Sequence, residues 1–192
     1  MKNLFLVLAM MLAGKFALAQ KELVTLDEHN KYIFYQVADM PGVTADTLYN
    51  RTMGGLKTNK LFKGIKPVVT AGSSITLKSK FTLYSSLTVA KHEVGDISYT
   101  LVTEFKDGKY RYWLTDFVFM PYQRTRYGVY AKIPNGDMTL EVVKTKYDAK
   151  IFDSYLEQIA KYGKDLGDEM KIYTATPIKT KPQPPKVDTR KW

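Results

Sequence analysis

The stretch Ile97–Phe119, ISYTLVTEFKDGKYRYWLTDFVF, decides the fold of this chain, because it predicts two long strands joined by a two-residue turn. From Ile97 to Phe105 the residues form two alternating sets, Ile97, Tyr99, Leu101, Thr103 and Phe105 in one and Ser98, Thr100, Val102 and Glu104 in the other. A period of two is typical of a strand with one face toward a core. The same period is expected to repeat from Tyr110 onward. Between the two runs, Asp107-Gly108 favours a type I′ turn, in which both central residues have positive φ. The stretch therefore predicts an antiparallel hairpin, but it indicates no chemistry.

The length and composition predict one folded domain with a sizeable core. The chain has 192 residues, of which 45% are hydrophobic and 13% are aromatic, and this is enough apolar material for a single domain. The sequence contains no cysteine. Disulfides, thiolate catalysis and a lipid anchor on an N-terminal cysteine are therefore excluded.

The first residues predict an export signal. Lys2 gives a positive start, Leu4–Ala13 is an uncharged apolar run, and Ala17-Leu18-Ala19 before Gln20 fits a small-x-small cleavage pattern. We expect cleavage between Ala19 and Gln20. The apolar run is shorter than the roughly 20 residues that a membrane-spanning helix needs, and no later stretch is a candidate. The protein is therefore expected in the periplasm or outside the cell.

The net charge of +10 is unevenly distributed. The residues from Pro177 to Trp192 carry one acid and five basic residues, namely Lys179, Lys181, Lys186, Arg190 and Lys191. Four prolines in the same stretch predict an extended, polyproline-like basic tail. Such a tail can attach a protein to anionic envelope polymers or to lipid head groups, and the alternative is a solvated end without function.

Between the signal and the tail, the pattern predicts one α+β domain. We divide the chain into a signal peptide (1–19), a lead-in (20–31), a single domain (32–176) and the tail (177–192). Before the central hairpin we expect strands at Tyr32–Ala38, Ile65–Ala71 and Ile75–Tyr84, and a short helix that Thr44 caps and Gly54-Gly55 weakens. After it we expect a second hairpin of Tyr127–Ile133 with Met138–Val143, and an amphipathic helix that Asp148 caps. This order predicts two layers, a mainly antiparallel sheet with two helices on one face.

Two stretches carry a resemblance to a known family. Pro41–Arg51 (PGVTADTLYNR) and Tyr99–Phe117 (YTLVTEFKDGKYRYWLTDF) resemble a Bacteroidetes family of exported proteins, a domain of unknown function with a TATA-binding-protein-like (TBP-like) fold. The resemblance covers about Tyr32 to Met120, and it implies the order β-α-β-β-β-β-α with an extra hairpin before the last helix. The sequence departs from the family at Met53-Gly54-Gly55. The resemblance implies neither an activity nor catalytic residues, and the fold name implies nothing about DNA.

The sequence predicts no catalytic residue, no metal site and no cofactor. His29 and His92 each lie in a polar stretch without a second ligand at metal-binding spacing. Glu93, Asp96 and Asp116 could supply a carboxylate pair, but the sequence does not fix their separation, which glycosidase-type catalysis requires. Basic and aromatic residues alternate in Lys109–Trp113, as in nucleic-acid sites. Export argues against nucleic acid, so we do not expect it as a partner.

The function expected from the sequence is that of an exported, non-enzymatic binding or assembly module of the cell envelope. Its contacts would be made through the uncovered sheet face, the basic tail or both, with an envelope protein or an anionic envelope polymer as partner. Arg111, Trp113 and Thr115 share one face of their strand, and we predict that this face is open because it carries the charge. The alternatives are that Trp113 belongs to the core, and that the protein is a periplasmic enzyme acting on an envelope polymer. Peripheral membrane association remains open, and the oligomeric state is not predicted.

Overall fold

The computed structural model describes residues 23–58, 62, 68–70, 73–85 and 91–176. The predicted cleavage point at Ala19 and Gln20 lies outside the described residues, and so does the whole basic tail. Along the described residues, no helix is both long enough and apolar enough to pass through a bilayer.

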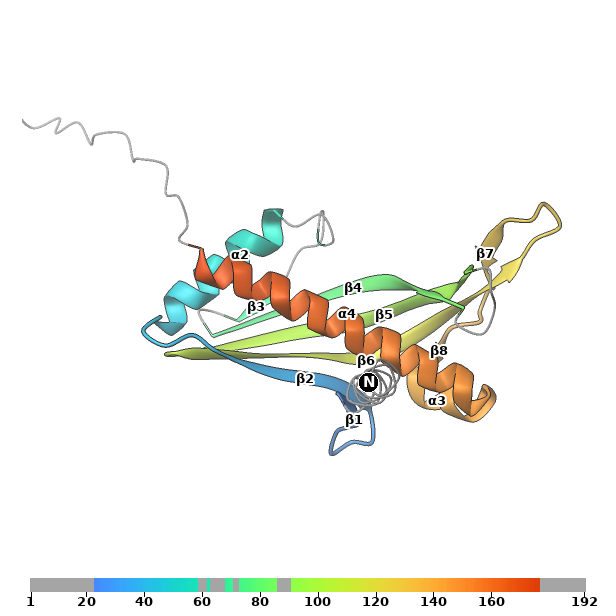
Figure 1. Ribbon diagram of the computed structural model, residues 1–192, viewed down its shortest axis with the longest axis horizontal. Coiled ribbons are helices and arrows are strands. Elements are labelled where there is room, and N and C mark those ends of the chain that lie inside the picture. The colour runs from blue at the N-terminus through green and yellow to red at the C-terminus, as the bar shows by residue number, and fades with distance from the viewer. Residues whose placement is uncertain (1–22, 59–61, 63–67, 71–72, 86–90, 177–192) are drawn as a thin grey trace, which may run out of the picture.

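The sheet is built around the predicted hairpin (Figure 1). Its two strands are β5 (Glu93–Lys106) and β6 (Lys109–Arg124). The other strands of the main path are β1 (Val24–Leu26), β2 (Tyr32–Asp39), β3 (Val68–Thr70) and β4 (Ser74–Tyr84), in the order β1-β2-β6-β5-β4-β3, and all neighbours are antiparallel. The strands predicted from Tyr32 and from Ile75 are confirmed. β1 arises within the expected lead-in and pairs with the start of β2.

The turn of the central hairpin is not the expected type I′ turn. Gly108 has a φ of 74°, but Asp107 is not among the residues with positive φ. The reason is that the turn is bonded to the connection between β2 and the first described helix. The Asp107 carboxylate accepts a hydrogen bond from the Ala45 N–H (2.8 Å), and the Gly108 N–H donates to the Val43 carbonyl (2.8 Å). These contacts select the turn conformation.

A β-bulge interrupts the alternation of β6. Ser98 pairs with Val118 and Thr100 pairs with Thr115, so two residues of β6 lie opposite Tyr99 alone. The extra residue is Asp116, whose φ of 52° is unusual for a residue with a side chain. The expected unbroken period of two is therefore wrong at this point. Before the bulge the even-numbered residues of β6 face the core, and after it the odd-numbered residues do: Tyr110, Tyr112, Leu114, Phe117 and Phe119.

Two helices cover one face of the sheet. The helix α2 (Ala45–Thr58) begins after Thr44, whose hydroxyl accepts a bond from the Thr47 N–H at 3.4 Å. The helix α4 (Ala149–Ala175) begins after Asp148, whose carboxylate accepts from the Lys150 N–H at 2.8 Å. Both predicted caps are confirmed. In Figure 1, α4 crosses the sheet diagonally and meets α2 near its C-terminal end. The predicted two-layer α+β fold is confirmed.

The expected second hairpin is wrong in its second strand. The strand β8 contains only Met138–Thr139, and the chain continues as the helix α3 (Leu140–Lys146). Leu140 and Val143 are buried at helical spacing, whereas the sequence analysis assigned both to the strand. In addition, β7 (Tyr130–Lys132) and β8 pair with β6 instead of with each other. The extra hairpin therefore consists of β6 and β7.

Glycines allow α4 to lie very close to the sheet and to α2. A Cβ on Gly163 would lie 2.7 Å from the Phe34 ring, and a Cβ on Gly167 would overlap the Tyr112 hydroxyl. That hydroxyl donates to the Gly163 carbonyl at 3.1 Å. On α2, a Cβ on Gly55 would overlap the Tyr173 ring of α4. The glycine pair, which was expected to weaken the end of this helix, therefore serves close packing against α4, and α2 extends to Thr58.

Candidate functional site

The burial of β6 identifies the open face of the sheet. Tyr110, Tyr112 and Leu114 are at most 2% exposed and lie beneath the helices. The predicted binding residues alternate with them and point the other way: Arg111 is exposed, and Trp113 and Thr115 are partly exposed. None of the helices that the structure describes covers this second face.

Five residues on three neighbouring strands form what we call the open-face patch: Tyr35 and Val37 of β2, Arg111 and Trp113 of β6, and Glu104 of β5. The strand register brings them together, since Trp113 pairs with Tyr35, and Arg111 pairs with both Val37 and Glu104. Tyr35 is 44% exposed and Val37 is 49% exposed. Arg111 and Trp113 were predicted from the sequence. Tyr35 and Val37 were not, because the periodicity of a single strand does not tell which strands are its neighbours.

Arg111 is held in place within the open-face patch. Its Nε donates to a carboxylate oxygen of Glu104 at 2.7 Å, and its Nη2 lies 2.5 Å from the same oxygen. The guanidinium carbon also lies 5.5 Å from the centre of the Trp113 ring, which is a cation–π distance. Hydrogen bonds from the guanidinium to Glu104 and Tyr35, together with the negative charge of Glu104, raise the pKa of Arg111. The patch therefore presents a fixed arginine between apolar surfaces.

A shallow hollow of about 160 Å³ lies at the turn end of the patch. It is lined by Tyr35, Val37, Glu104, Lys106, Lys109, Tyr110 and Arg111. Sites for drug-sized molecules usually occupy about 300–1,000 Å³, so this hollow is too small to enclose such a ligand. The surface suits a flat or extended partner better than a small molecule.

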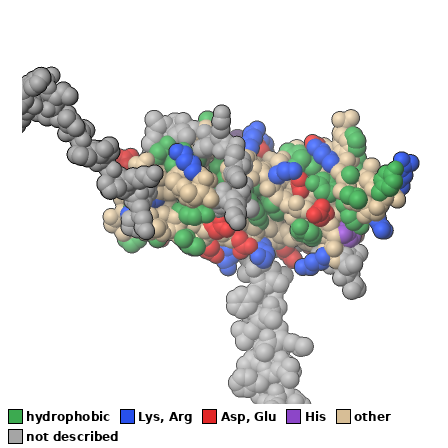
Figure 2. Space-filling view, turned by 90° about the horizontal axis from the view of Figure 1, so that it is seen from above, with side chains coloured by type: hydrophobic (Ala, Val, Ile, Leu, Met, Phe, Trp, Pro, Cys, Tyr) green, Lys and Arg blue, Asp and Glu red, His purple; other side chains and the backbone are tan. Residues whose placement is uncertain are grey.

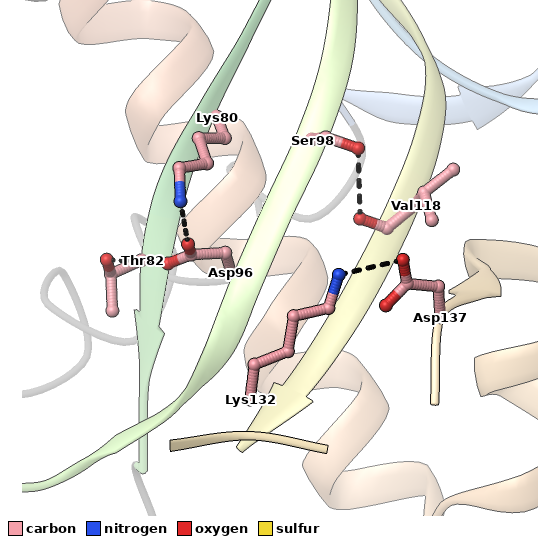
Figure 3. Close-up of polar contacts among 7 residues, drawn as sticks. All are labelled: Lys80, Thr82, Asp96, Ser98, Val118, Lys132 and Asp137. Atoms are coloured by element: carbon pink, nitrogen blue, oxygen red, sulfur yellow. Dashed lines mark hydrogen bonds and ion pairs between the residues drawn. The ribbon is translucent and has the colours of Figure 1, made fainter. Parts of the chain in front are cut away.

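A closed polar cluster lies farther along the same face, around Asp96 (Figure 3). Asp96 is only 4% exposed, and its carboxylate accepts bonds from the Lys80 ammonium (2.6 Å) and the Thr82 hydroxyl (2.9 Å). Burial of the carboxylate acts to raise the pKa of Asp96, but hydrogen bonds from Lys80, Thr82 and Tyr122 and the charge of Lys80 outweigh it, so the pKa is lowered. This arrangement stabilises the charged carboxylate, which is the opposite of what a general acid requires.

Three other titratable residues that the sequence offered as candidates have contacts other than Asp96: Asp116, His29 and His92. Asp116 pairs with Lys31 at 2.8 Å, and His29 lies 3.8 Å from Glu28. The His92 ring stacks on Tyr130, with ring centres 4.9 Å apart. Within the described part of the chain, no three His, Asp or Glu side chains gather in a way that could hold a metal ion.

A second hollow, of about 360 Å³, lies where α3 and α4 meet the start of β2. It is lined by Tyr32, Lys144, Tyr147, Ala149, Phe152, Asp153 and Leu156. The Lys144 ammonium lies 5.9 Å from the centre of the Tyr32 ring. The sequence did not predict this hollow, because its lining residues come from separate parts of the chain that only the fold brings together.

This geometry defines a class: a two-layer α+β domain in which the described helices cover one face of an antiparallel sheet and none of them covers the other. Residues 34–120 match a family described as "Domain of unknown function (DUF4468) with TBP-like fold". The match confirms the resemblance that Pro41–Arg51 and Tyr99–Phe117 indicated. None of the curated proteins matches the chain.

Two solved structures share the fold. A TBP-like protein from Parabacteroides distasonis has 13% sequence identity and a TM-score of 0.61, with 81% of this chain and 99% of that chain covered. A DUF4468 family protein from Bacteroides ovatus also has 13% identity, with a TM-score of 0.56 and coverage of 83% of this chain and 94% of that chain. At this level of identity the likeness shows the fold alone.

Proposed function

We propose that this chain is an exported, non-enzymatic binding module of the bacterial cell envelope, and that its folded domain holds a partner on the open-face patch. The observation that carries the proposal is the combination of Trp113, Tyr35 and Val37 with a fixed Arg111 on the face opposite the helices. Tryptophan, tyrosine and arginine are the residues that most often dominate the energy of a protein interface.

The shape of the patch supports a macromolecular partner. Its neighbouring hollow is shallow and small, whereas an envelope protein or a polymer chain can lie across several strands. The Arg111–Glu104 pair is preorganised, since both groups keep their contacts without a ligand, and less side-chain entropy is then lost on binding.

The basic tail adds a second contact in this proposal. Lys179, Lys181, Lys186, Arg190 and Lys191 would attract an anionic envelope polymer, and salt would weaken that attraction. The tail and the open-face patch therefore make separable contributions.

The test is co-sedimentation of the chain from Gln20 to Trp192 with isolated envelope fractions, at low and at high salt. The same measurement is made with Trp113→Ser, with Arg111→Gln and with a chain that stops at Thr176. We expect binding that survives high salt and truncation but falls about tenfold or more in the Trp113→Ser chain, as for a central interface residue.

The matched control is Lys164→Gln, which removes an exposed charge from the helical face. It should bind like the unchanged protein. Circular dichroism must show that the Trp113→Ser chain remains folded at the assay temperature. If the folded Trp113→Ser and Arg111→Gln chains bind as well as the unchanged protein, the open-face patch is not the binding site.

A further inference from the structure

The two strands β6 and β7 extend beyond the rest of the sheet as an arm (Figure 1). We call residues 121–133 the arm and residues 125–129 its tip. The strands pair from Tyr122 with Lys132 to Arg124 with Tyr130. The arm lies just past the segment that matches the family, which ends at residue 120.

The base of the arm is fixed, and its tip is bare. At the base, the Ile133 N–H donates to the Pro121 carbonyl (2.8 Å), and Tyr130 stacks on His92. At the tip, Tyr127 is 77% exposed and Val129 is 62% exposed. Because these apolar side chains lie exposed at the end of a projecting hairpin, they add little to the buried apolar area of the described domain. Neighbouring exposed apolar side chains of this kind indicate a surface that meets a partner.

The shape of the tip is set by its own backbone. The Thr125 N–H donates to the Val129 carbonyl (2.8 Å), and the Gly128 N–H donates to the Thr125 carbonyl (2.9 Å). Gly128 has a φ of 80°, which few residues other than glycine adopt. Tyr127 and Val129 are therefore presented in a fixed arrangement.

The charge of the arm is entirely positive. No Asp or Glu occurs between Asp116 and Asp137, whereas Arg124, Arg126 and Lys132 lie within this segment. Lys132 is paired with Asp137 at 2.9 Å (Figure 3). Arg126 lies against the Tyr127 ring, with its guanidinium carbon 4.8 Å from the ring centre and its Nη2 2.8 Å from the hydroxyl. At the right-hand end of Figure 2, where the arm projects, basic and hydrophobic side chains lie together.

We propose that the tip of the arm docks on an anionic lipid surface, with Tyr127 and Val129 entering the head-group region and with Arg124 and Arg126 contacting lipid phosphates. A projecting tip with exposed apolar and basic side chains can enter the head-group region of a fluid anionic surface. Aromatic and aliphatic groups combined with basic residues are the usual means of peripheral membrane contact. This inference is independent of the open-face patch, because the two sites share no residue.

The test uses vesicles of phosphatidylcholine and vesicles of phosphatidylcholine mixed with phosphatidylglycerol, with the chain from Gln20 to Trp192 so that the apolar signal segment does not itself bind lipid. We expect sedimentation with the anionic vesicles only. The double change Tyr127→Ser and Val129→Ser should lower the partition coefficient about tenfold. The double change Arg124→Gln and Arg126→Gln should lower it about 25-fold at low salt, or about fivefold for each charge.

Matched controls separate the arm from general charge and from the tail. Ile172→Ser removes an apolar side chain that is 64% exposed on α4. The double change Lys150→Gln and Lys164→Gln removes the same net charge from exposed positions of α4. Both should bind nearly like the unchanged chain. Each comparison is repeated with chains that stop at Thr176, so that any binding through the tail is subtracted.

The absence of cysteine allows a direct test of insertion. A polarity-sensitive dye on Val129→Cys should shift to the blue with anionic vesicles, and the same dye on Ile172→Cys should not. The proposal is overturned if the arm variants bind as well as the unchanged chain, if all binding is lost with the tail, or if the dye on the tip remains in water. Absence of vesicle binding would also overturn it and would leave a protein partner for the tip.

Discussion

Gly167 and Gly163 bring α4 into direct contact with rings of the sheet, and this contact predicts a specific stability change. Gly167→Ala should lower the free energy of unfolding by about 1–3 kcal/mol, because the new methyl group overlaps the Tyr112 hydroxyl and the core must shift. Urea denaturation measures the change. The control is Lys164→Ala, at an exposed position of the same helix. Its free energy of unfolding should stay within about 0.5 kcal/mol of that of the unchanged protein.

A double-mutant cycle tests the cause of that cost. In a Tyr112→Phe chain the hydroxyl is absent, so Gly167→Ala should cost less than in the unchanged protein. An equal cost in both backgrounds would show that the Tyr112 hydroxyl is not the obstacle. The methyl group of Gly163→Ala would instead meet the Phe34 ring. Tyr112→Phe should therefore reduce the stability cost of Gly163→Ala less than that of Gly167→Ala.

Asp96 predicts a pH dependence of stability. Its pKa in the folded protein lies below the ordinary value of 3.8, so its charged form favours the fold. The stabilisation is present above the pKa of the unfolded chain and is lost as the pH falls through the lower pKa of the folded protein. Asp96→Asn should therefore lower the free energy of unfolding by about 1–2 kcal/mol near neutral pH.

Urea denaturation at about pH 7 and about pH 3 measures this effect. The difference between the Asp96→Asn chain and the unchanged chain should shrink at the acid pH. If it stays constant, the bonds from Lys80 and Thr82 do not depend on the charge of Asp96. Asp165→Asn, which breaks an exposed pair with Lys161, is a suitable control because exposed pairs contribute little.

At the scale of single residues, the sequence predicted the alternation of Arg111, Tyr112 and Trp113 correctly. It could not predict the burial of Asp96, which depends on its neighbours on β4 and β6. It also assigned Gly54-Gly55 to a weak helix end, because glycine gives the same signal for flexibility and for close packing. Only the position of Tyr173 distinguishes the two.

Among the elements, the bulge of β6 predicts an ordered series of substitutions at Asp116. Asp116→Val should destabilise the protein by about 1–2 kcal/mol, because a β-branched residue strongly disfavours a φ of 52°. Asp116→Asn tolerates this backbone conformation and should cost at most about 0.5 kcal/mol, since the lost pair with Lys31 is exposed. Thermal or urea denaturation ranks the variants. A chain with Asp116→Val that is as stable as the one with Asp116→Asn would show that the conformation of the bulge is not strained.

Long elements were predicted correctly, whereas a short element whose conformation depends on tertiary contacts was not. The central hairpin and α4 are long and strongly periodic, so their patterns are unambiguous. Met138–Val143 is short, and its apolar residues suit a strand or a helix equally well. Burial of Leu140 and Val143 beneath the rest of the fold decides for the helix.

At the scale of the whole molecule, the described domain should fold without the tail. The buried hydrophobic core extends from Val24 to Met170, and α4 ends with a bond from the Thr176 N–H to the Ile172 carbonyl. The free energy of unfolding of a chain from Gln20 to Thr176 should therefore lie within about 0.5 kcal/mol of that of the chain that ends at Trp192. Calorimetry and urea denaturation check this boundary. A larger loss would mean that the tail contributes to the core and that the division at residue 177 is wrong.

The overall architecture was predictable because the hairpin, the capped helices and the resemblance all indicated the same two layers. The arm was not. The direction of the arm follows from the pairing of both β7 and β8 with the long strand β6. The sequence between residues 121 and 139 predicts turns, but it does not predict with which strand the residues after each turn will pair. The neighbours of the open-face patch were hidden for the same reason.

The bulge at Asp116 also affects how relatives of this chain should be compared. It is a one-residue insertion in a strand that otherwise alternates between core and surface. Against a relative whose strand lacks the bulge, an alignment that places the gap elsewhere in β6 would exchange core and surface positions over the intervening residues. Trp113 and Arg111 would then be matched with buried residues of a homologue. The strand of such a relative should therefore be aligned with the gap at Asp116. Only that alignment can show whether the relative has an aromatic residue and an arginine on the open face.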